Sequence, residues 1–139
     1  MRAVIDVNVL ISAMLSPAGA PADTLRAWRA GRYELIVSPR LLTELERALR
    51  YPRIVRRLPV ERSSEVVAMI ASDATVADDV GDPPPRSRDP QDDYLLALAE
   101  DQVALLVSGD LDLLALSDTL PVLAPAAFVT WLERHADPD

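Results

Sequence analysis

Apolar residues along this chain gather in short continuous runs, separated by longer segments in which apolar residues recur at helical spacing. The runs are rich in valine, isoleucine and leucine and are bounded by polar or turn-forming residues, which is typical of buried strands. They cover residues 2–7, 33–38, 75–78, 103–108 and 120–125. The pattern therefore predicts five short strands spread along the whole chain.

The segments between these runs predict helices over residues 8–16, 22–31, 38–50, 59–74, 89–102 and 125–136. A further short helix is expected to begin within "GDLDLL" (109–114). Ser38 and Asp89 each suit a helix N-cap, and a proline follows each of them at the first helical position. Residues 78–90 are rich in proline and acidic residues and predict a loop.

Strands that alternate with helices predict an α/β fold with a parallel sheet covered by helices on both faces. A length of 139 residues favours a single domain over 1–139. Ligands of such sheets bind beyond the carboxyl ends of the strands, near the point where the strand order reverses. The residues that follow each predicted strand are therefore the first candidates for a functional site.

Composition narrows the chemistry that this site can perform. The chain has no cysteine, which excludes disulfides, thiolate metal sites and cysteine nucleophiles. All 14 basic residues are arginine, so lysine-dependent phosphate sites and Schiff bases are excluded as well. One histidine rules out a ribonuclease mechanism that needs two. With a net charge of −8, nucleic acid can be bound only through a local basic patch or bound metal ions.

Location can also be predicted from the pattern. No segment reaches the roughly 18 apolar residues of a membrane span. The first 15 residues resemble a signal peptide in outline, but Asp6 and Asn8 interrupt the apolar part. We therefore expect a cytoplasmic protein that makes no contact with a membrane.

Carboxylates follow the predicted strands. They are Asp6 after the first strand, Glu44 on the helix after the second, Asp92 and Asp93 at the start of a later helix, and Asp110 and Asp112 after the fourth strand. Each also has a purely structural interpretation. Asp6 or Asn8 can cap the first helix, and acidic residues at a helix start complement its dipole. Periodicity does not choose between Glu44 and Glu46, which flank the same apolar stripe.

Taken together, these acids suggest a metal site. Like charges gathered at one edge of a sheet repel and raise one another's pKa values, and a divalent cation removes that conflict. Oxygen ligands without histidine or cysteine favour Mg²⁺ or Mn²⁺ over zinc or copper. The main use of such a site is phosphoryl chemistry, in which the metal activates a water molecule.

Four motifs in order carry a resemblance to a known family. They are "VIDVNVLISAML", "SPRLLTEL", "DPQDDYLLALA" and "LLVSGDLDLL". In this respect the chain resembles the PIN domain, and within it the bacterial toxin components of toxin–antitoxin systems related to VapC-like ribonucleases. The resemblance implies a three-layer α/β/α fold with a central, mostly parallel sheet. It also implies metal-dependent cleavage of RNA.

The resemblance also assigns roles to residues. Carried over by position, Asp6, Glu44, Asp93 and Asp110 are the catalytic metal ligands, Asp112 is a further ligand, and Asn8, Asp92 and Ser108 support the site. The family pattern thus selects Glu44 over Glu46. The two adjacent acids depart from the commoner pattern, because successive helical residues point about 100° apart. Which of Asp92 and Asp93 is the main ligand therefore stays open.

Residues 40–62 contain seven arginines, of which Arg40, Arg47 and Arg50 lie on the helix face opposite the leucines. Three interpretations remain: a solvated helix face, a strip that binds RNA phosphates, or a surface that meets an acidic partner peptide.

The leading hypothesis is a Mg²⁺- or Mn²⁺-dependent endoribonuclease that hydrolyses RNA phosphodiesters by metal-activated water. The resemblance implies that it is the toxin of a toxin–antitoxin pair, with RNA as substrate and a cognate antitoxin protein as partner. A homodimer is expected because dimers are common in the family. The alternatives are a catalytically weak PIN protein that binds RNA or antitoxin, and a metal-dependent phosphohydrolase.

Overall fold

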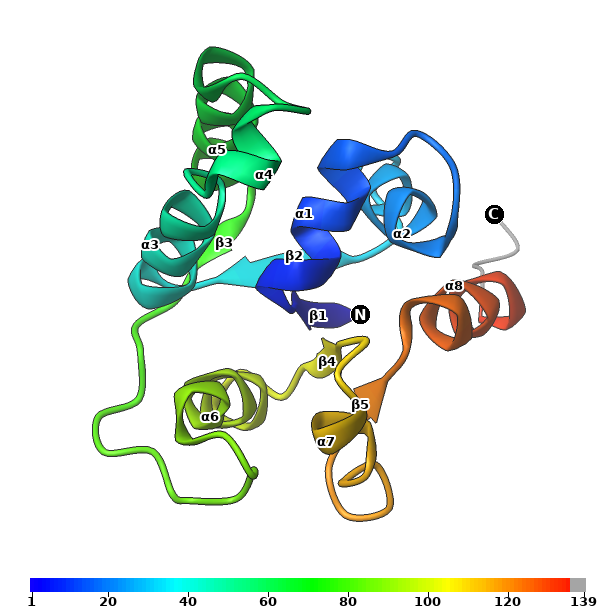
Figure 1. Ribbon diagram of the computed structural model, residues 1–139. Coiled ribbons are helices and arrows are strands. Elements are labelled where there is room, and N and C mark those ends of the chain that lie inside the picture. The colour runs from blue at the N-terminus through cyan, green and yellow to red at the C-terminus, as the bar shows by residue number, and fades with distance from the viewer. Residues whose placement is uncertain (136–139) are drawn as a thin grey trace.

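A central sheet of five parallel strands organises the computed structural model of this protein, which describes residues 1–135 (Figure 1). The strands are β1 (Arg2–Ile5), β2 (Glu34–Val37), β3 (Thr75–Val76), β4 (Leu105–Val107) and β5 (Val122–Leu123). Their order across the sheet is β3-β2-β1-β4-β5, and every neighbouring pair is parallel. The strand order reverses between β1 and β4, so the switch point of the sheet lies beside β1.

The sheet is apolar because helices cover it. In the register, Val4 of β1 lies opposite Ile36 of β2 and Leu106 of β4, and all three are fully buried. Strands buried on both faces need apolar residues at every position, which explains the continuous apolar runs in the sequence.

Eight α-helices and one 3₁₀ turn connect and follow the strands within residues 1–135. They are α1 (Val7–Leu15), α2 (Ala20–Arg29), α3 (Pro39–Ala48), α4 (Pro52–Val55), α5 (Val60–Asp73), the 3₁₀ turn η1 (Pro90–Asp92), α6 (Asp93–Asp101), α7 (Leu111–Leu114) and α8 (Pro125–Arg134). Figure 1 shows α1, α2 and α8 on one side of the sheet and α6 on the other. The molecule is thus a three-layer α/β/α fold, as the sequence predicted.

Local signals placed several element boundaries. Ser38 caps α3 by accepting a hydrogen bond from the Leu41 N–H at 3.2 Å, and Pro39 occupies the first helical position. The Asp89 side chain caps η1 in the same way, through the Gln91 N–H at 3.0 Å. Both caps confirm the sequence prediction.

Other boundaries differ from the prediction. The first strand ends at Ile5 because Asp6 already serves as the N-cap of α1. The helix predicted over 89–102 begins as the 3₁₀ turn η1 and becomes α-helical only at Asp93. The short helix α4 was not predicted at all. The predicted end of the last helix at residue 136 lies outside the described residues.

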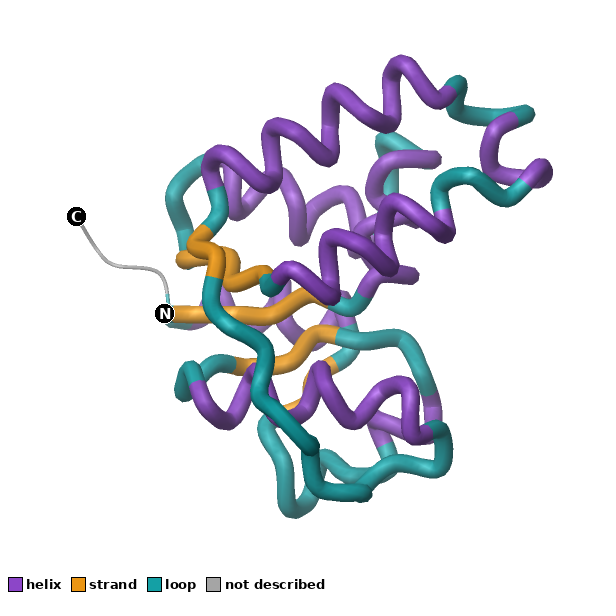
Figure 2. The backbone as a smooth tube through the Cα atoms, turned by 90° about the vertical axis from the view of Figure 1, so that its left-hand side faces the viewer, coloured by secondary structure: helices purple, strands orange, loops and turns teal. Residues whose placement is uncertain are grey.

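Helices α3 and α5 lie side by side and point in opposite directions, and α4 joins them at their tip (Figure 2). The same view shows this tip on the side of the sheet toward which the strands run. Ile54 of α4 and Leu58 just after it are buried, which fixes α4 against the rest of the fold.

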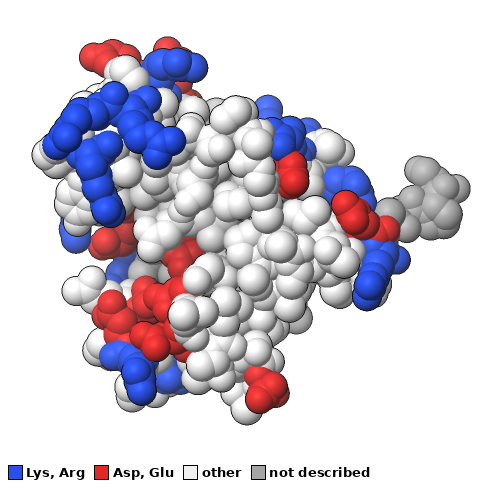
Figure 3. Space-filling view, turned by 45° about the vertical axis from the view of Figure 1, so that its right-hand side comes forward, with Lys and Arg blue, Asp and Glu red and all other residues white. Residues whose placement is uncertain are grey.

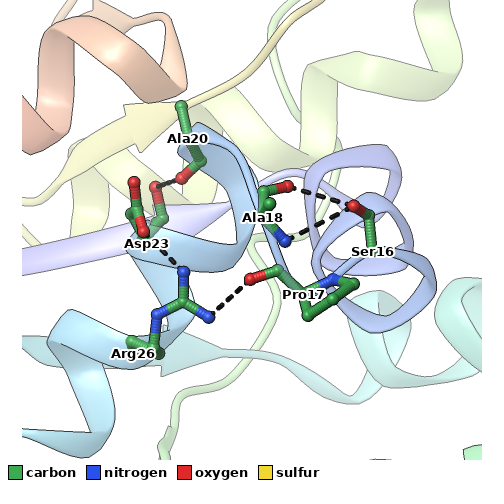
Figure 4. Close-up of polar contacts among 7 residues, drawn as sticks. Ser16, Pro17, Ala18, Ala20, Asp23 and Arg26 are labelled. Atoms are coloured by element: carbon green, nitrogen blue, oxygen red, sulfur yellow. Dashed lines mark hydrogen bonds and ion pairs between the residues drawn. The ribbon is translucent and has the colours of Figure 1, made fainter.

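Hydrogen bonds hold the loop between α1 and α2 in place (Figure 4). The Ser16 hydroxyl donates to the Ala18 carbonyl oxygen at 3.1 Å. Arg26 of α2 donates to the Pro17 carbonyl oxygen at 2.8 Å and pairs with Asp23 at 2.6 Å. These contacts fix the loop beside α1, whose first residues belong to the candidate site described below.

Within residues 1–135, none of the helices has the length and apolar character needed to cross a membrane.

Candidate carboxylate site

Asp6 lies at the carboxyl end of β1, and its carboxylate is almost completely buried. The backbone places it there, because the Asp6 N–H donates to the Val107 carbonyl oxygen of β4 at 2.9 Å. Its Oδ1 accepts a hydrogen bond from the Asn8 N–H at 3.4 Å, and its Oδ2 accepts one from the Ser108 hydroxyl at 2.7 Å. Asp6 is therefore a helix cap and a buried acid at the switch point of the sheet at the same time.

The neighbouring strand β4 delivers Ser108 and Asp110 to the same place. Ser108 is fully buried, and its Oγ also accepts a hydrogen bond from the Asp110 N–H at 3.0 Å. Burial raises the pKa of Asp6; the Ser108 hydrogen bond opposes this rise, and the Asp110 charge adds to it. The ends of β1 and β4 therefore bring Asp6 and Asp110 within electrostatic reach of each other.

Asp92 is the third acid of this group. Burial raises its pKa to about 6, and the charges of Asp6, Asp89, Asp110 and Asp93 raise it as well. Because the charges of Asp6 and Asp110 act on Asp92, the carboxylate at the end of η1 lies near both strand ends. The structure thus gathers Asp6, Asp92 and Asp110 from three separate parts of the sequence.

Asp93 has a different task. It is buried, and its Oδ1 accepts three hydrogen bonds: from the Arg86 N–H at 3.1 Å, the Ser87 N–H at 2.8 Å and the Ser87 hydroxyl at 2.9 Å. Burial raises the pKa of Asp93, but the hydrogen bonds from Ser87 and Arg86 outweigh burial and leave the pKa below its usual value. Asp93 therefore fastens the proline-rich loop to the start of α6.

These contacts bear on a choice that the sequence left open. The resemblance gave Asp93 as a ligand and Asp92 as a supporting residue, without deciding which of the two is the main ligand. In the structure, Asp92 is the acid coupled to Asp6 and Asp110, whereas one Asp93 oxygen is taken up by the loop.

Glu44 of α3 lies within electrostatic reach of Tyr94. Burial raises the pKa of the Tyr94 phenol, and the charges of Glu44 and Asp6 raise it further. The Glu44 carboxylate is partly exposed and pairs with Arg47 at 3.5 Å. The charges of Glu44 and Asp6 thus both act on Tyr94.

Asp112 and Asn8 lie at the edge of this group. The Asp112 N–H donates to Asp110 Oδ1 at 2.8 Å, which fixes the start of α7, while the half-exposed Asp112 carboxylate lies 4.0 Å from Arg88. Asn8 is exposed and lines a hollow of about 290 Å³ whose wall includes Ser12 and Asp110. The expected roles of Asp112 and Asn8 are thus confined to the rim.

The three arginines expected on the polar face of α3 make different contacts. The Arg40 guanidinium stacks 4.3 Å from the centre of the Tyr94 ring, and the Arg40 N–H donates to Asp79 at 2.9 Å. Arg47 is paired with Glu44, and Arg50 is exposed just after α3. The Arg40–Tyr94 contact was not predicted from the sequence, because it depends on the packing of α3 against α6 and leaves no periodic pattern around position 94.

The acids of the site are suited to a hard divalent cation, although within residues 1–135 no three of them converge closely enough to form a ready-made metal cage. All donors are oxygen atoms, which suits Mg²⁺ or Mn²⁺. Figure 3 shows one group of acidic side chains close together on the face toward the viewer, with other acidic side chains scattered around the molecule. The repulsion that raises the pKa of Asp92 is the conflict that a bound cation relieves.

Comparison with known proteins agrees with this architecture. A family model described as "PIN domain" matches residues 2–112. An uncharacterized protein of Methanocaldococcus jannaschii is 27% identical over 144 residues, which cover 96% of this chain and 93% of that protein.

Two solved structures share the fold. VapBC2 from Rickettsia felis, bound to a DNA fragment from its promoter, superposes with a TM-score of 0.63 at 13% identity, covering 89% of this chain and 98% of that chain. VapBC-1 from nontypeable Haemophilus influenzae gives a TM-score of 0.61 at 14% identity, covering 91% and 99%.

Proposed function

Because this chain belongs to the PIN domain family, we propose that it is a Mg²⁺- or Mn²⁺-dependent endoribonuclease and the toxin of a toxin–antitoxin pair. The observation that carries the proposal is the pair of hydrogen bonds by which Ser108 joins Asp6 to Asp110 at the switch point of a parallel sheet. Ligand sites of open α/β sheets lie at this position.

In this proposal, Asp6, Asp92 and Asp110 hold the cation, and Glu44 completes the set from α3. These carboxylates would be neutralised by a divalent cation, which when bound would supply an activated water molecule for attack on phosphorus. Our sequence-based ligand set also contained Asp93 and Asp112. The contacts of Asp93 and Asp112 support positioning roles at the adjoining loop and at the start of α7.

Ser108 and Asn8 orient Asp6, the buried acid at the end of β1. The Ser108 hydroxyl binds one oxygen of Asp6 and the Asn8 N–H binds the other, so the carboxylate has a single orientation. The 2.7 Å contact also favours the ionised form of Asp6 against the effect of burial. Ser108 thereby keeps Asp6 in the charge state that a cation requires.

An antitoxin partner is proposed by analogy with the VapBC complexes that share this fold. The net charge of −8 makes the chain electrostatically complementary to a basic partner segment. We also expect a homodimer, as common in the family, and a cytoplasmic location. Co-expression with the product of the neighbouring gene tests the partner, and light scattering tests the dimer.

The chemistry is tested by mapping the ends of RNA fragments. Purified protein is incubated with single-stranded RNA and Mn²⁺, with a parallel reaction in EDTA. Attack by water predicts 5′-phosphate and 3′-hydroxyl ends that appear only with Mn²⁺. Cyclic phosphate ends, or cleavage that persists in EDTA, would contradict the proposal, and RNA binding without turnover under either Mg²⁺ or Mn²⁺ would favour a binding protein instead.

A further inference from the structure

Four arginines surround the short helix α4 at the tip of the α3–α5 pair, and we call them the α4 arginine cluster. They are Arg50, Arg53, Arg56 and Arg57. All four side chains are exposed, while Ile54 and Leu58 of the same turn are buried. The apolar pair anchors the turn, so the arginines are presented on a fixed element of the fold.

The cluster has no carboxylate partners within residues 1–135. No ion pair is formed by any of its four guanidinium groups, although acidic residues outnumber basic ones by 22 to 14 in the chain. Arginines elsewhere do find partners: Arg26 pairs with Asp23, and Arg29 with Asp73. Among contacts with residues 1–135, Arg57 makes the one side-chain hydrogen bond of the cluster, to the Leu15 carbonyl oxygen at 3.3 Å.

Position relates the cluster to the carboxylate site. Figure 2 places α4 on the side of the sheet toward which the strands run, which is also where Asp6 and Asp110 follow β1 and β4. Figure 3 shows a large group of arginine side chains and the main group of acidic side chains on the same face of the molecule. A single extended ligand can therefore contact both.

We propose that the α4 arginine cluster binds backbone phosphates of the RNA strand whose scissile phosphate lies at the carboxylate site. This inference rests on the proposed function, because it names contacts for the substrate of that same site. The cluster is not the set of arginines that the sequence suggested, and the two sets have only Arg50 in common. The other two members of the earlier set have partners in the structure, because Arg40 stacks on Tyr94 and Arg47 pairs with Glu44.

Electrostatics favours RNA as the occupant. A polyanion that approaches Asp6, Asp92 and Asp110 is repelled by them and by the net charge of −8, so it needs local cations beside the site. Guanidinium groups bind phosphate oxygens through paired hydrogen bonds and keep their charge at any physiological pH. An acidic peptide would satisfy the same charges, but the shared face with the carboxylate site points to the substrate strand.

The test measures the affinity of the full chain for a fluorescently labelled single-stranded oligoribonucleotide by anisotropy, in EDTA so that no turnover occurs. The variant is Arg53→Gln with Arg56→Gln. Its control is Arg29→Gln with Arg134→Gln, which removes the same charge from exposed positions on α2 and α8. Circular dichroism checks that both variants are folded.

We expect the Arg53/Arg56 variant to bind about tenfold more weakly, with a salt dependence of log K reduced by roughly 1.4, because each phosphate contact on single-stranded nucleic acid contributes about 0.7. The control should match wild type in both quantities. Unchanged RNA affinity and salt slope in the Arg53/Arg56 variant would overturn the inference. It would also be overturned if this variant lost binding to poly-glutamate but kept its binding to RNA.

The two proposals fail separately. If wild type binds the RNA through the cluster but never cleaves it with Mn²⁺, the proposed function is wrong and the binding surface stands. If wild type cleaves RNA and the Arg53/Arg56 variant binds it normally, only the inference about the cluster is wrong.

Discussion

The Ser108 hydroxyl donates a 2.7 Å hydrogen bond to Asp6 Oδ2 and so joins two residues that are 102 positions apart in the sequence. Parallel pairing of β1 with β4 makes the contact possible, because Ile5 lies opposite Val107 and the next residue of each strand leaves the sheet at the same edge. The register of the sheet thus builds the centre of the candidate site.

Replacing Ser108 with alanine should lower the free energy of unfolding at neutral pH by about 1–3 kcal/mol, because a buried carboxylate loses its donor. The Asp110 N–H loses its acceptor in the same variant. Urea unfolding measures the change. Ser64→Ala, at an exposed position of α5, is the control and should stay within about 0.5 kcal/mol of wild type. Equal stabilities for the two variants would show that the Ser108 contact is energetically unimportant.

Asp92 and Asp93 should respond oppositely to substitution. Asp93→Ala removes the acceptor of the Arg86 and Ser87 N–H groups and should cost about 1–3 kcal/mol of stability. Asp92→Asn removes a repelled charge, so it should preserve or raise stability while reducing RNA cleavage. Thermal melting and a cleavage assay separate the two effects. The roles are assigned incorrectly if Asp93→Asn abolishes cleavage and Asp92→Asn does not.

Without a metal, Asp92 should make stability depend on pH. Its pKa is raised to about 6 in the folded chain, mainly by burial, against about 3.9 when unfolded. Between these values the folded chain keeps a proton that the unfolded chain has lost, so the contribution of Asp92 to stability falls as pH rises from about 4 to about 6.

In the Asp92→Asn variant this side chain stays neutral at every pH, so the variant should not lose stability in this way as the pH rises. In EDTA, its stability relative to wild type should therefore increase from about pH 4 to about pH 6 and stay level above that. Urea unfolding at intervals across this range measures the difference, and a difference that does not change with pH would contradict the account.

Gly31 follows the C-cap of α2 and has a φ of +77°. A Cβ added at this position would meet no atom within 4 Å apart from its chain neighbours, so it would cause no steric clash. Gly31→Ala should therefore cost about 1–2 kcal/mol through backbone strain alone. Gly81→Ala is the matched control, because Gly81 has open space and no positive φ. Chemical unfolding of both variants is the measurement, and equal stabilities would disprove the assigned strain.

The sequence predicted those parts of the fold that local patterns determine. Five apolar runs became the five strands, and the Ser38-Pro39 pair placed the start of α3. Helix α4 escaped prediction because a segment of four residues is too short to show helical periodicity. Its buried residues Ile54 and Leu58 are recognisable only once α3 and α5 are seen to pack against each other.

The contacts of each candidate site residue could not be predicted from the sequence. Periodicity shows that Asp92 and Asp93 diverge, yet which of them faces the strand ends depends on the path of the loop before η1. That path is tertiary information, since Asp93 is drawn to the Arg86 and Ser87 N–H groups. The same holds for Arg40, whose stacking on Tyr94 requires α3 and α6 to meet.

The most direct test of the account is the rate of Mn²⁺-dependent RNA cleavage by Asp6→Asn, compared with wild type and with Asp118→Asn at an exposed position. Because Asp6 is the buried acid at the switch point, the account predicts a loss of at least about 100-fold for Asp6→Asn. Asp118→Asn should cleave like wild type. Cleavage by Asp6→Asn at the wild-type rate would contradict the central claim.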